Sequence, residues 1–172
     1  NDTQSAHVIS NYSGFMLVPA LALMGEFLAI HDNDSNKITE DLFVIAETVI
    51  IAANINQLTK FSFARQRPYS HYKNQDGLAD SSISVDDNLS FYSGHTSFAF
   101  SLAVSAGTIS EMRNYKYHWL VWTGGIASAA FTGYMRIAAD KHYFSDVLVG
   151  AVIGSALGFA MPHLFNDLNN VK

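Results

Sequence analysis

The chain has 172 residues, of which 49% are hydrophobic and 15% are charged, and its formal net charge is −5 at pH 7. This composition excludes an intrinsically disordered protein, because such chains combine low hydrophobicity with high net charge. The acidic balance provides no basic surface for nucleic acid. The chain has no cysteine, which excludes disulfides and thiolate metal sites. A chain of this length can bury one sizeable core, so we expect a single domain over residues 1–172.

Long apolar runs alternate with polar segments along the chain. The runs exceed the usual length of a strand and are rich in alanine, leucine and methionine, which favour helix. We therefore predict an all-α protein, a bundle of about five to seven helices. The segment 68–92 has no helical period, and a connection of that length inside a compact domain is typical of a functional loop. The predicted helices cover about residues 14–30, 41–60, 96–110, 117–135 and 144–161.

The run 118–135 has no Asp, Glu, Lys or Arg and is about long enough to cross a bilayer. The first two predicted helices contain Glu26 and Glu47, and an acidic side chain inside a membrane is costly. The connections 31–41 and 111–117 show little of the Lys and Arg excess that marks short cytoplasmic loops. We therefore favour a soluble or peripheral membrane-associated protein, with an integral membrane protein as the alternative.

The segment "KFSFARQRP" carries two cations. Lys60 precedes Arg67 by two turns of a helix, so the side chains would share one face, and Pro68 would end that helix. Two cations on one face can hold an anion. The alternative is a solvated helix end, where Lys and Arg favour the negative end of the helix dipole.

The segment "SFYSGHTSFAF" places Ser93 and Gly94 in front of a predicted helix. The free N–H groups at the start of a helix can bind an anion, and glycine lets the backbone approach it closely. His95 would lie beside that anion. The alternative is a serine N-cap followed by a histidine that only packs.

The segment "RIAADKHYFSD" contains a histidine and an aspartate four residues apart, His142 and Asp146. On a helix the carboxylate can accept the Nδ1 proton of the imidazole and leave Nε2 as a lone-pair donor. Such an imidazole suits a nucleophile or a base, and Arg136 upstream offers a planar fork for phosphate oxygens. The alternative is a surface hydrogen bond.

The three segments together resemble the signature of the type 2 phosphatidic acid phosphatase (PAP2) superfamily, which also includes the bacterial class A acid phosphatases and the vanadium haloperoxidases. Two positions depart from the usual pattern, since Tyr92 stands in place of a proline and Met135 in place of a serine. Neither departure removes a charged or nucleophilic group, so we expect them to affect substrate fit and rate. The matching residues are Lys60, Arg67, Pro68, Ser93, Gly94, His95, Arg136, His142 and Asp146.

The resemblance implies a helical bundle with an active site at one end and a reaction that needs no metal ion. His142 would attack phosphorus through Nε2 and form a phosphohistidine, while Asp146 fixes its tautomer. His95 would protonate the leaving oxygen and later activate the attacking water. The phosphate oxygens would be held by Lys60, Arg67, Ser93, Gly94 and Arg136.

Three functions follow as alternatives from this resemblance. The first is a metal-independent phosphomonoesterase, whose substrate is a lipid phosphate, an isoprenoid pyrophosphate or a small phosphate ester. The second is a haloperoxidase that carries vanadate where the phosphatase binds phosphate, and the third is a phosphate-binding protein without turnover. The resemblance also implies an extracytoplasmic location, in the bacterial periplasm or on the outer face of the inner membrane. The loop 69–91 should line the entrance, and its Asp76, Asp80, Asp86 and Asp87 disfavour polyphosphates.

Overall fold

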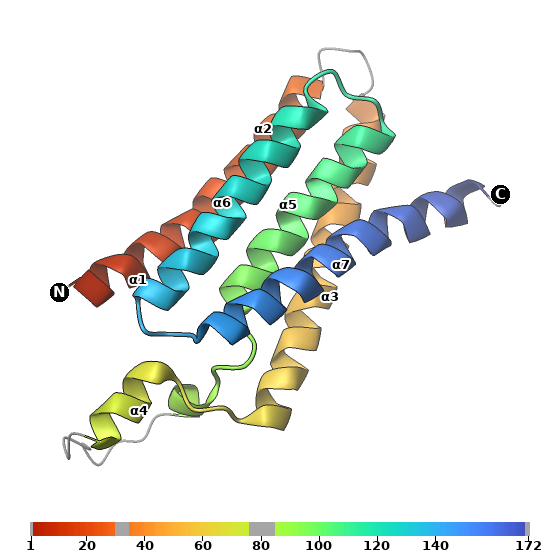
Figure 1. Ribbon diagram of the computed structural model, residues 1–172. Helices are drawn as coiled ribbons and strands as arrows, with labels where there is room; N and C mark the ends of the chain where they lie inside the picture. The colour runs from red at the N-terminus through yellow and green to blue at the C-terminus, as the bar shows by residue number, and fades with distance from the viewer. Residues whose placement is uncertain (1, 30–34, 76–84, 171–172) are drawn as a thin grey trace.

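A computed structural model describes residues 2–29, 35–75 and 85–170, and the regular structure in these ranges is helical (Figure 1). The predicted all-α fold is therefore confirmed. The elements are α1 (Asp2–Tyr12), a π-helical segment (Ser13–Leu17), α2 (Val18–Ala29), α3 (Ser35–Phe63), α4 (Pro68–Gln75), a 3₁₀ turn (Val85–Asn88), α5 (Gly94–Met112), α6 (His118–Ala138) and α7 (Phe144–Asn170).

Helices α2, α3, α5, α6 and α7 lie where the apolar runs predicted them, but several extend further. The helical path begins at Asp2, well before the predicted start, and α7 continues past residue 161. The segment 68–92 was predicted without helix, yet Pro68 starts α4, because proline suits the first position of a helix. Asp76 and Asp80 lie outside the described residues.

Helix α5 lies at the centre of the bundle and packs against α7, α6 and α3 (Figure 1). Its buried side chains are mostly alanine, serine and threonine, which lets neighbouring backbones come close. Three glycines of α7 use this space. A Cβ atom added at Gly154 or Gly158 would lie 2.5 or 2.8 Å from a backbone oxygen of α5, and one at Gly150 would lie 2.7 Å from the backbone oxygen of Ser93, the N-cap of α5. The spacing of four residues aligns these glycines on one face of α7.

Large apolar side chains cover the outside of the bundle instead of its centre. Phe43, Leu58, Tyr134, Phe144 and Val152 are each 60 to 70% exposed. A water-soluble protein of this size normally buries most of its large apolar side chains, so this distribution indicates a surface that faces an apolar medium or a partner.

Two helical stretches within the described residues have the length and composition of membrane spans, Thr3–Leu23 and Phe144–Phe165. Only 33% and 22% of these windows are buried inside the protein, whereas the core helix of a soluble protein is mostly buried. The uncharged run 118–135, the predicted candidate for a membrane span, belongs to α6. That stretch lacks charge, but its glycine, serine and threonine residues lower its hydropathy.

Candidate active site

The predicted site residues gather at the end of the bundle that faces α4, where α3 ends and where α5 and α7 begin (Figure 1). The side chains of Ser93, His142 and Asp146 are almost completely buried there. Within the segment between α4 and α5, Ser90 is also fully buried. The site is therefore formed by residues that are distant in the sequence.

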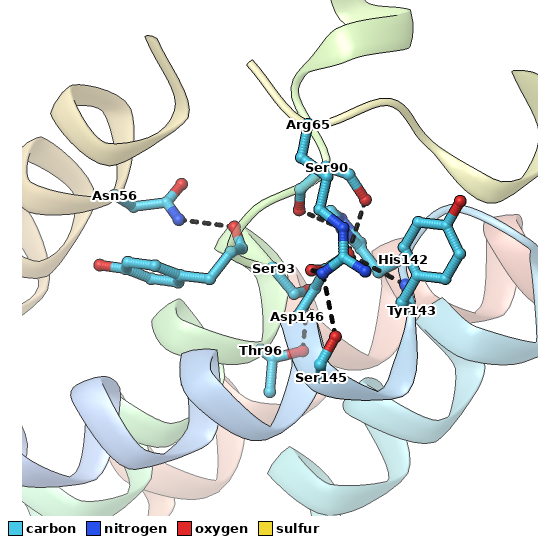
Figure 2. Close-up of polar contacts among 10 residues, drawn as sticks. Asn56, Arg65, Ser90, Ser93, Thr96, His142, Tyr143, Ser145 and Asp146 are labelled. Atoms are coloured by element: carbon cyan, nitrogen blue, oxygen red, sulfur yellow. Dashed lines mark hydrogen bonds and ion pairs between the residues drawn. The ribbon is translucent and has the colours of Figure 1, made fainter. Parts of the chain in front are cut away.

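His142 donates its Nδ1 proton to the backbone oxygen of Ser90, since the carbonyl can only accept, and the two atoms are 2.7 Å apart (Figure 2). The spacing in the sequence predicts Asp146 as the acceptor of this proton, but Oδ2 of Asp146 lies 3.9 Å from Nδ1. That oxygen instead accepts hydrogen bonds from the Ser90 hydroxyl at 2.6 Å and from the Tyr143 N–H at 3.0 Å. The predicted partner was wrong, but the tautomer is the expected one, with the lone pair on Nε2.

Arg65 holds the other oxygen of Asp146, through an ion pair of 2.6 Å between Nη1 and Oδ1 (Figure 2). The same Nη1 donates to the Ser145 hydroxyl at 2.9 Å, and the guanidinium lies over the Tyr143 ring, 4.3 Å from its centroid. The Asp146 carboxylate thus has charged or polar partners on both oxygens. Arg65 was missed in the sequence, although it stands only two residues before Arg67.

The Ser93–Gly94 pair lies at the start of α5, as predicted. The Ser93 side chain makes no capping bond to this helix, and its oxygen accepts a hydrogen bond from the Thr96 hydroxyl at 2.9 Å. A Cβ atom at Gly94 would lie 2.7 Å from Oδ1 of Asn56 and 3.5 Å from Nζ of Lys60. Glycine is therefore needed at position 94 for α5 to approach the side chains of α3.

His95 contacts the N-terminal part of the chain. Its Nε2 lies 2.9 Å from Oδ1 of Asn11, an acceptor, so Nε2 carries the proton. The Phe15 ring packs edge-on against the imidazole, with centroids 4.7 Å apart. Burial, together with the positive charges of Arg136 and Lys60, lowers the pKa of His95 to about 3.

Burial also lowers the pKa of His142 well below its usual value, and the charges of Arg136, Arg67 and Lys60 add to this effect. His142 is therefore neutral at pH 7. The charges of the same three cations lower the pKa of both histidines. The positive charges of Lys60, Arg67 and Arg136 therefore act on both histidines, and their roles in holding phosphate stay predictions.

Lys60 and Arg67 reach the site by a different route from the one predicted. Helix α3 ends at Phe63, and Ala64 has a φ of 46°, so the chain turns before Arg67 and the two residues share no helix face. The Arg67 N–H then donates to the backbone oxygen of Asp87 at 2.8 Å, and its side chain is 5% exposed. Pro68, predicted to end the helix that carries Lys60, instead begins α4.

Arg136 lies near the end of α6 and is 2% exposed. Its Nη1 donates to Nδ1 of His7 and to the hydroxyl of Ser10, and each of these distances is 3.0 Å. Helix α1 thus supports both a cation and, through Asn11, a histidine of the site. Nothing in the sequence of α1 indicated this role, because its polar residues show no motif.

Two further residues escaped the sequence analysis. Ser90 joins His142 to Asp146, and Asn56 donates its Nδ2 proton to the backbone oxygen of Tyr92 at 2.8 Å (Figure 2). Asn56 stands one helical turn before Lys60, so the two side chains lie on the same face of the helix. This spacing is the feature of the sequence that could have indicated Asn56 as a residue of the site. Within the described ranges, His, Cys, Asp and Glu side chains form no group of three that could hold a metal ion.

A buried neutral histidine, an adjacent carboxylate, a second histidine and three cations define a site suited to phosphoryl transfer. The family model of the PAP2 superfamily matches residues 41–170, which include every residue of the predicted site. The chain belongs to this superfamily, and the resemblance found in the motifs is confirmed. No solved structure matches the chain.

Named relatives include lipid phosphatases from animals and bacteria. Phospholipid phosphatase 2 of Bos taurus is 28% identical over 78% of this chain and 55% of its own length. Lipid A 4'-phosphatase of Porphyromonas gingivalis is 29% identical over 69% of this chain and 50% of its own length. Lipid A 1-phosphatase of the same bacterium is 35% identical over 58% of this chain and 18% of its own length. The chain thus spans about half the length of the first two relatives.

Proposed function

We propose that the protein is a metal-independent phosphatase that hydrolyses a lipid phosphate through a phosphohistidine. The observation that carries this proposal is the state of His142, which is buried and neutral and has its Nδ1 proton held by the Ser90 carbonyl. An imidazole in this state has its lone pair on Nε2. A nucleophile of this kind beside three cations fits attack on a phosphate group.

In the first step, Nε2 of His142 forms a bond to phosphorus as the bond from phosphorus to the leaving oxygen breaks. His95 gives a proton to that oxygen, in place of its bond to Asn11, and the product alcohol leaves. In the second step His95 takes a proton from water, whose oxygen attacks phosphorus and releases phosphate from Nε2. Lys60, Arg67 and Arg136 would stabilise the charge on the equatorial oxygens.

The low pKa of His95 fits this cycle once substrate is present. Without substrate, burial and the surrounding cations keep the imidazole neutral. A bound phosphate brings negative charge next to His95 and offsets those cations, which raises the affinity of the imidazole for a proton. The acid would therefore become charged together with substrate binding.

A lipid substrate is supported by the names of the relatives and by the exterior of the bundle. Phospholipid and lipid A phosphatases are among the proteins that match. The two apolar stretches, mostly unburied, and the exposed large side chains fit a bundle inserted in a bilayer. The surface thus weighs against the soluble protein that the charged residues suggested. We also propose that the site faces the extracytoplasmic side.

Phosphate release decides the proposed activity. The purified protein in detergent should release phosphate from phosphatidate and from p-nitrophenyl phosphate. A quench in alkaline dodecyl sulfate should trap a phosphorylated protein that keeps its phosphate in base and loses it in acid, as phosphohistidine does. The location is tested by alkaline carbonate washing of membranes. Protein that stays in the pellet and dissolves only in detergent supports insertion, whereas release by carbonate supports a peripheral protein.

A further inference from the structure

Helix α1 lies outside the segment that matches the PAP2 family model, which begins at residue 41. Two of its side chains nevertheless contact predicted site residues. Asn11 lies against His95, with 2.9 Å between Oδ1 and Nε2, and His7 accepts a hydrogen bond from Arg136 at 3.0 Å. The family match assigns no role to these side chains of α1, so a role has to be inferred from their contacts.

The polar residues of α1 match no family motif, but they share one face of the helix. His7, Ser10 and Asn11 stand three and four residues apart, a spacing that places them on the same side. Ser10 is fully buried, and the other two are half-buried. On the opposite side, Val8 and Tyr12 are 45% and 62% exposed. Burying polar groups costs free energy unless they find partners, so this face depends on the contacts that it makes with the site.

The π-helical segment holds the end of α1 beside the imidazole of His95. Ser13 accepts a hydrogen bond from the Thr132 hydroxyl of α6 at 3.0 Å. A Cβ atom at Gly14 would lie 3.2 Å from Cγ2 of Thr132 and 3.8 Å from Cδ2 of His95, so the backbone passes close to both residues. Phe15 packs edge-on against the imidazole. Single π-helical turns of this kind occur frequently at functional sites.

Asn11 gives the Nε2 proton of His95 a neutral acceptor. Burial lowers the pKa of His95 to about 3, and the neighbouring charged and titratable groups add to this effect, namely Arg136 of α6, Lys60 of α3, His7 of α1 and Arg67. An amide oxygen accepts the proton without offsetting these groups. A carboxylate at the same place would pair with the imidazolium and raise this pKa. The amide therefore fixes the ring while it leaves the imidazole neutral.

A cavity of about 230 Å³ lies beside the imidazole and provides room for a leaving group. It is lined by His95, Lys60 and Phe15 among others, and Asn11 is not among the lining residues. The Nε2 proton thus has one acceptor in the protein and space for another beside the ring. An exchange between the two acceptors needs no large movement of the helices.

We propose that Asn11 is a positioning residue for the acid: it fixes the ring and the tautomer of His95 and, being neutral, lets the imidazole become charged only when phosphate is bound. The inference rests on the proposed phosphatase activity. As substrate brings negative charge, the imidazole takes up a second proton from water on Nδ1. The Nε2 proton then moves to the leaving oxygen as the bond from that oxygen to phosphorus breaks, and the imidazole is again neutral.

The first test compares two esters whose leaving groups need the acid to different degrees. Phenol is a weaker acid than p-nitrophenol, so the loss of phenol depends more on protonation. In Asn11→Ala we expect kcat/KM for phenyl phosphate to fall by about tenfold, the effect of one hydrogen bond in a buried site. For p-nitrophenyl phosphate the fall should be less than about threefold. A contact that only stabilises the fold would lower both values equally.

The second test uses Asn11→Asp, which keeps the shape of the side chain and adds a charge. The carboxylate stabilises the imidazolium, so the alkaline limb of the pH profile of kcat for phenyl phosphate should move up by about one pH unit or more. The matched control is Asn54→Ala, an exposed asparagine of α3 that bonds to its own helix at Ile50. It should leave the ester ratio and the pH profile as in wild type. Thermal unfolding in the same detergent shows whether each variant is folded.

The inference and the proposed function fail in different ways. Equal losses for the two esters in a folded Asn11→Ala, or an alkaline limb that stays in place in Asn11→Asp, would overturn the role of Asn11. In both cases turnover by the wild type would still support the phosphatase. If Asn11→Ala does not fold, the pH profile of Asn11→Asp decides alone. Absence of phosphate release from both esters in the wild type would overturn the proposed function and the role of Asn11 with it.

Discussion

Ser90 links His142 to Asp146 through its two polar groups: its carbonyl accepts the Nδ1 proton of His142 at 2.7 Å, and its hydroxyl donates to Asp146 at 2.6 Å. The Asp146 carboxylate therefore affects the His142 imidazole in two ways: its negative charge acts across space, and its hydrogen bond fixes the position of Ser90. Because the residue is fully buried, neither bond competes with water.

We predict that Ser90→Ala lowers kcat by about tenfold, because removing a hydrogen bond to a buried charge costs about 1.5 to 3 kcal/mol and part of this cost reaches the nucleophile. The backbone carbonyl remains, so the tautomer of His142 is kept. The matched control is Ser145→Ala, which removes a hydroxyl that contacts Arg65 and should change kcat less than twofold. Equal losses in the two variants would contradict a positioning role for Ser90.

His142→Ala should lower turnover by about three orders of magnitude or more, a barrier increase above roughly 4 kcal/mol, because no other group can form the covalent intermediate. The measurements are the steady-state release of p-nitrophenol and the amount of acid-labile phosphate bound to the protein, which should be absent in the variant. Activity within tenfold of wild type would show that His142 is not the nucleophile.

Orthovanadate should inhibit competitively and bind more tightly than phosphate, since vanadate adopts a five-coordinate geometry like that of the transition state. The cations Lys60, Arg67 and Arg136 would hold it. EDTA should leave activity unchanged. Loss of activity in EDTA that magnesium or zinc restores would contradict the proposed mechanism.

Acidification should destabilise the fold through the two site histidines. Their pKa values are lowered from 6.5, to about 3 for His95, so between these values the unfolded chain binds more protons than the folded one. The free energy of unfolding then falls with decreasing pH, by up to about 1.4 kcal/mol per pH unit for each histidine.

Thermal unfolding in detergent between pH 7.5 and 5 measures this effect. The melting temperature of the wild type should fall more steeply than that of the double variant His95→Asn and His142→Asn. Bound vanadate should make the melting temperature of the wild type depend less on pH, because the negative charge of vanadate offsets the cations that lower the pKa of the two histidines. Parallel curves for wild type and double variant would contradict the prediction.

Much of the site could be predicted from the sequence because its residue types and spacings carry the chemistry. The order from Lys60 to Asp146 identified the superfamily, and the apolar runs located the main helices. The contact between His142 and Ser90 could not be predicted, because a backbone carbonyl leaves no mark on the sequence. The same holds for Arg136 and His7, which are 129 residues apart.

Other differences arose from tertiary structure that overrides local patterns. The pair Lys60 and Arg67 has helical spacing, yet the chain turns at Ala64 between them. The contacts between α5 and α7, by contrast, did leave a signal that was overlooked. Gly150, Gly154 and Gly158 recur every four residues, and small residues at this spacing are typical of closely packed helices in membranes.

Gly154 offers the sharpest test of this packing. A Cβ atom there would lie 2.5 Å from the backbone oxygen of Ser97, and neither backbone can move without separating α7 from α5. At Gly124 the nearest atom to an added Cβ is a methyl carbon of Leu21 at 4.0 Å, an ordinary contact.

We therefore predict that Gly154→Ala lowers the free energy of unfolding by about 1 to 3 kcal/mol, the usual cost of overpacking, although alanine is the better helix former. Gly124→Ala should be neutral or stabilise by up to about 1 kcal/mol, because it gains helix propensity without a clash. Thermal unfolding of the two variants in the same detergent provides the comparison. Ser97 and His95 line the same cavity, so Gly154→Ala should reduce lipid turnover as well. An unaltered melting temperature of Gly154→Ala would show that α5 and α7 are not in close contact.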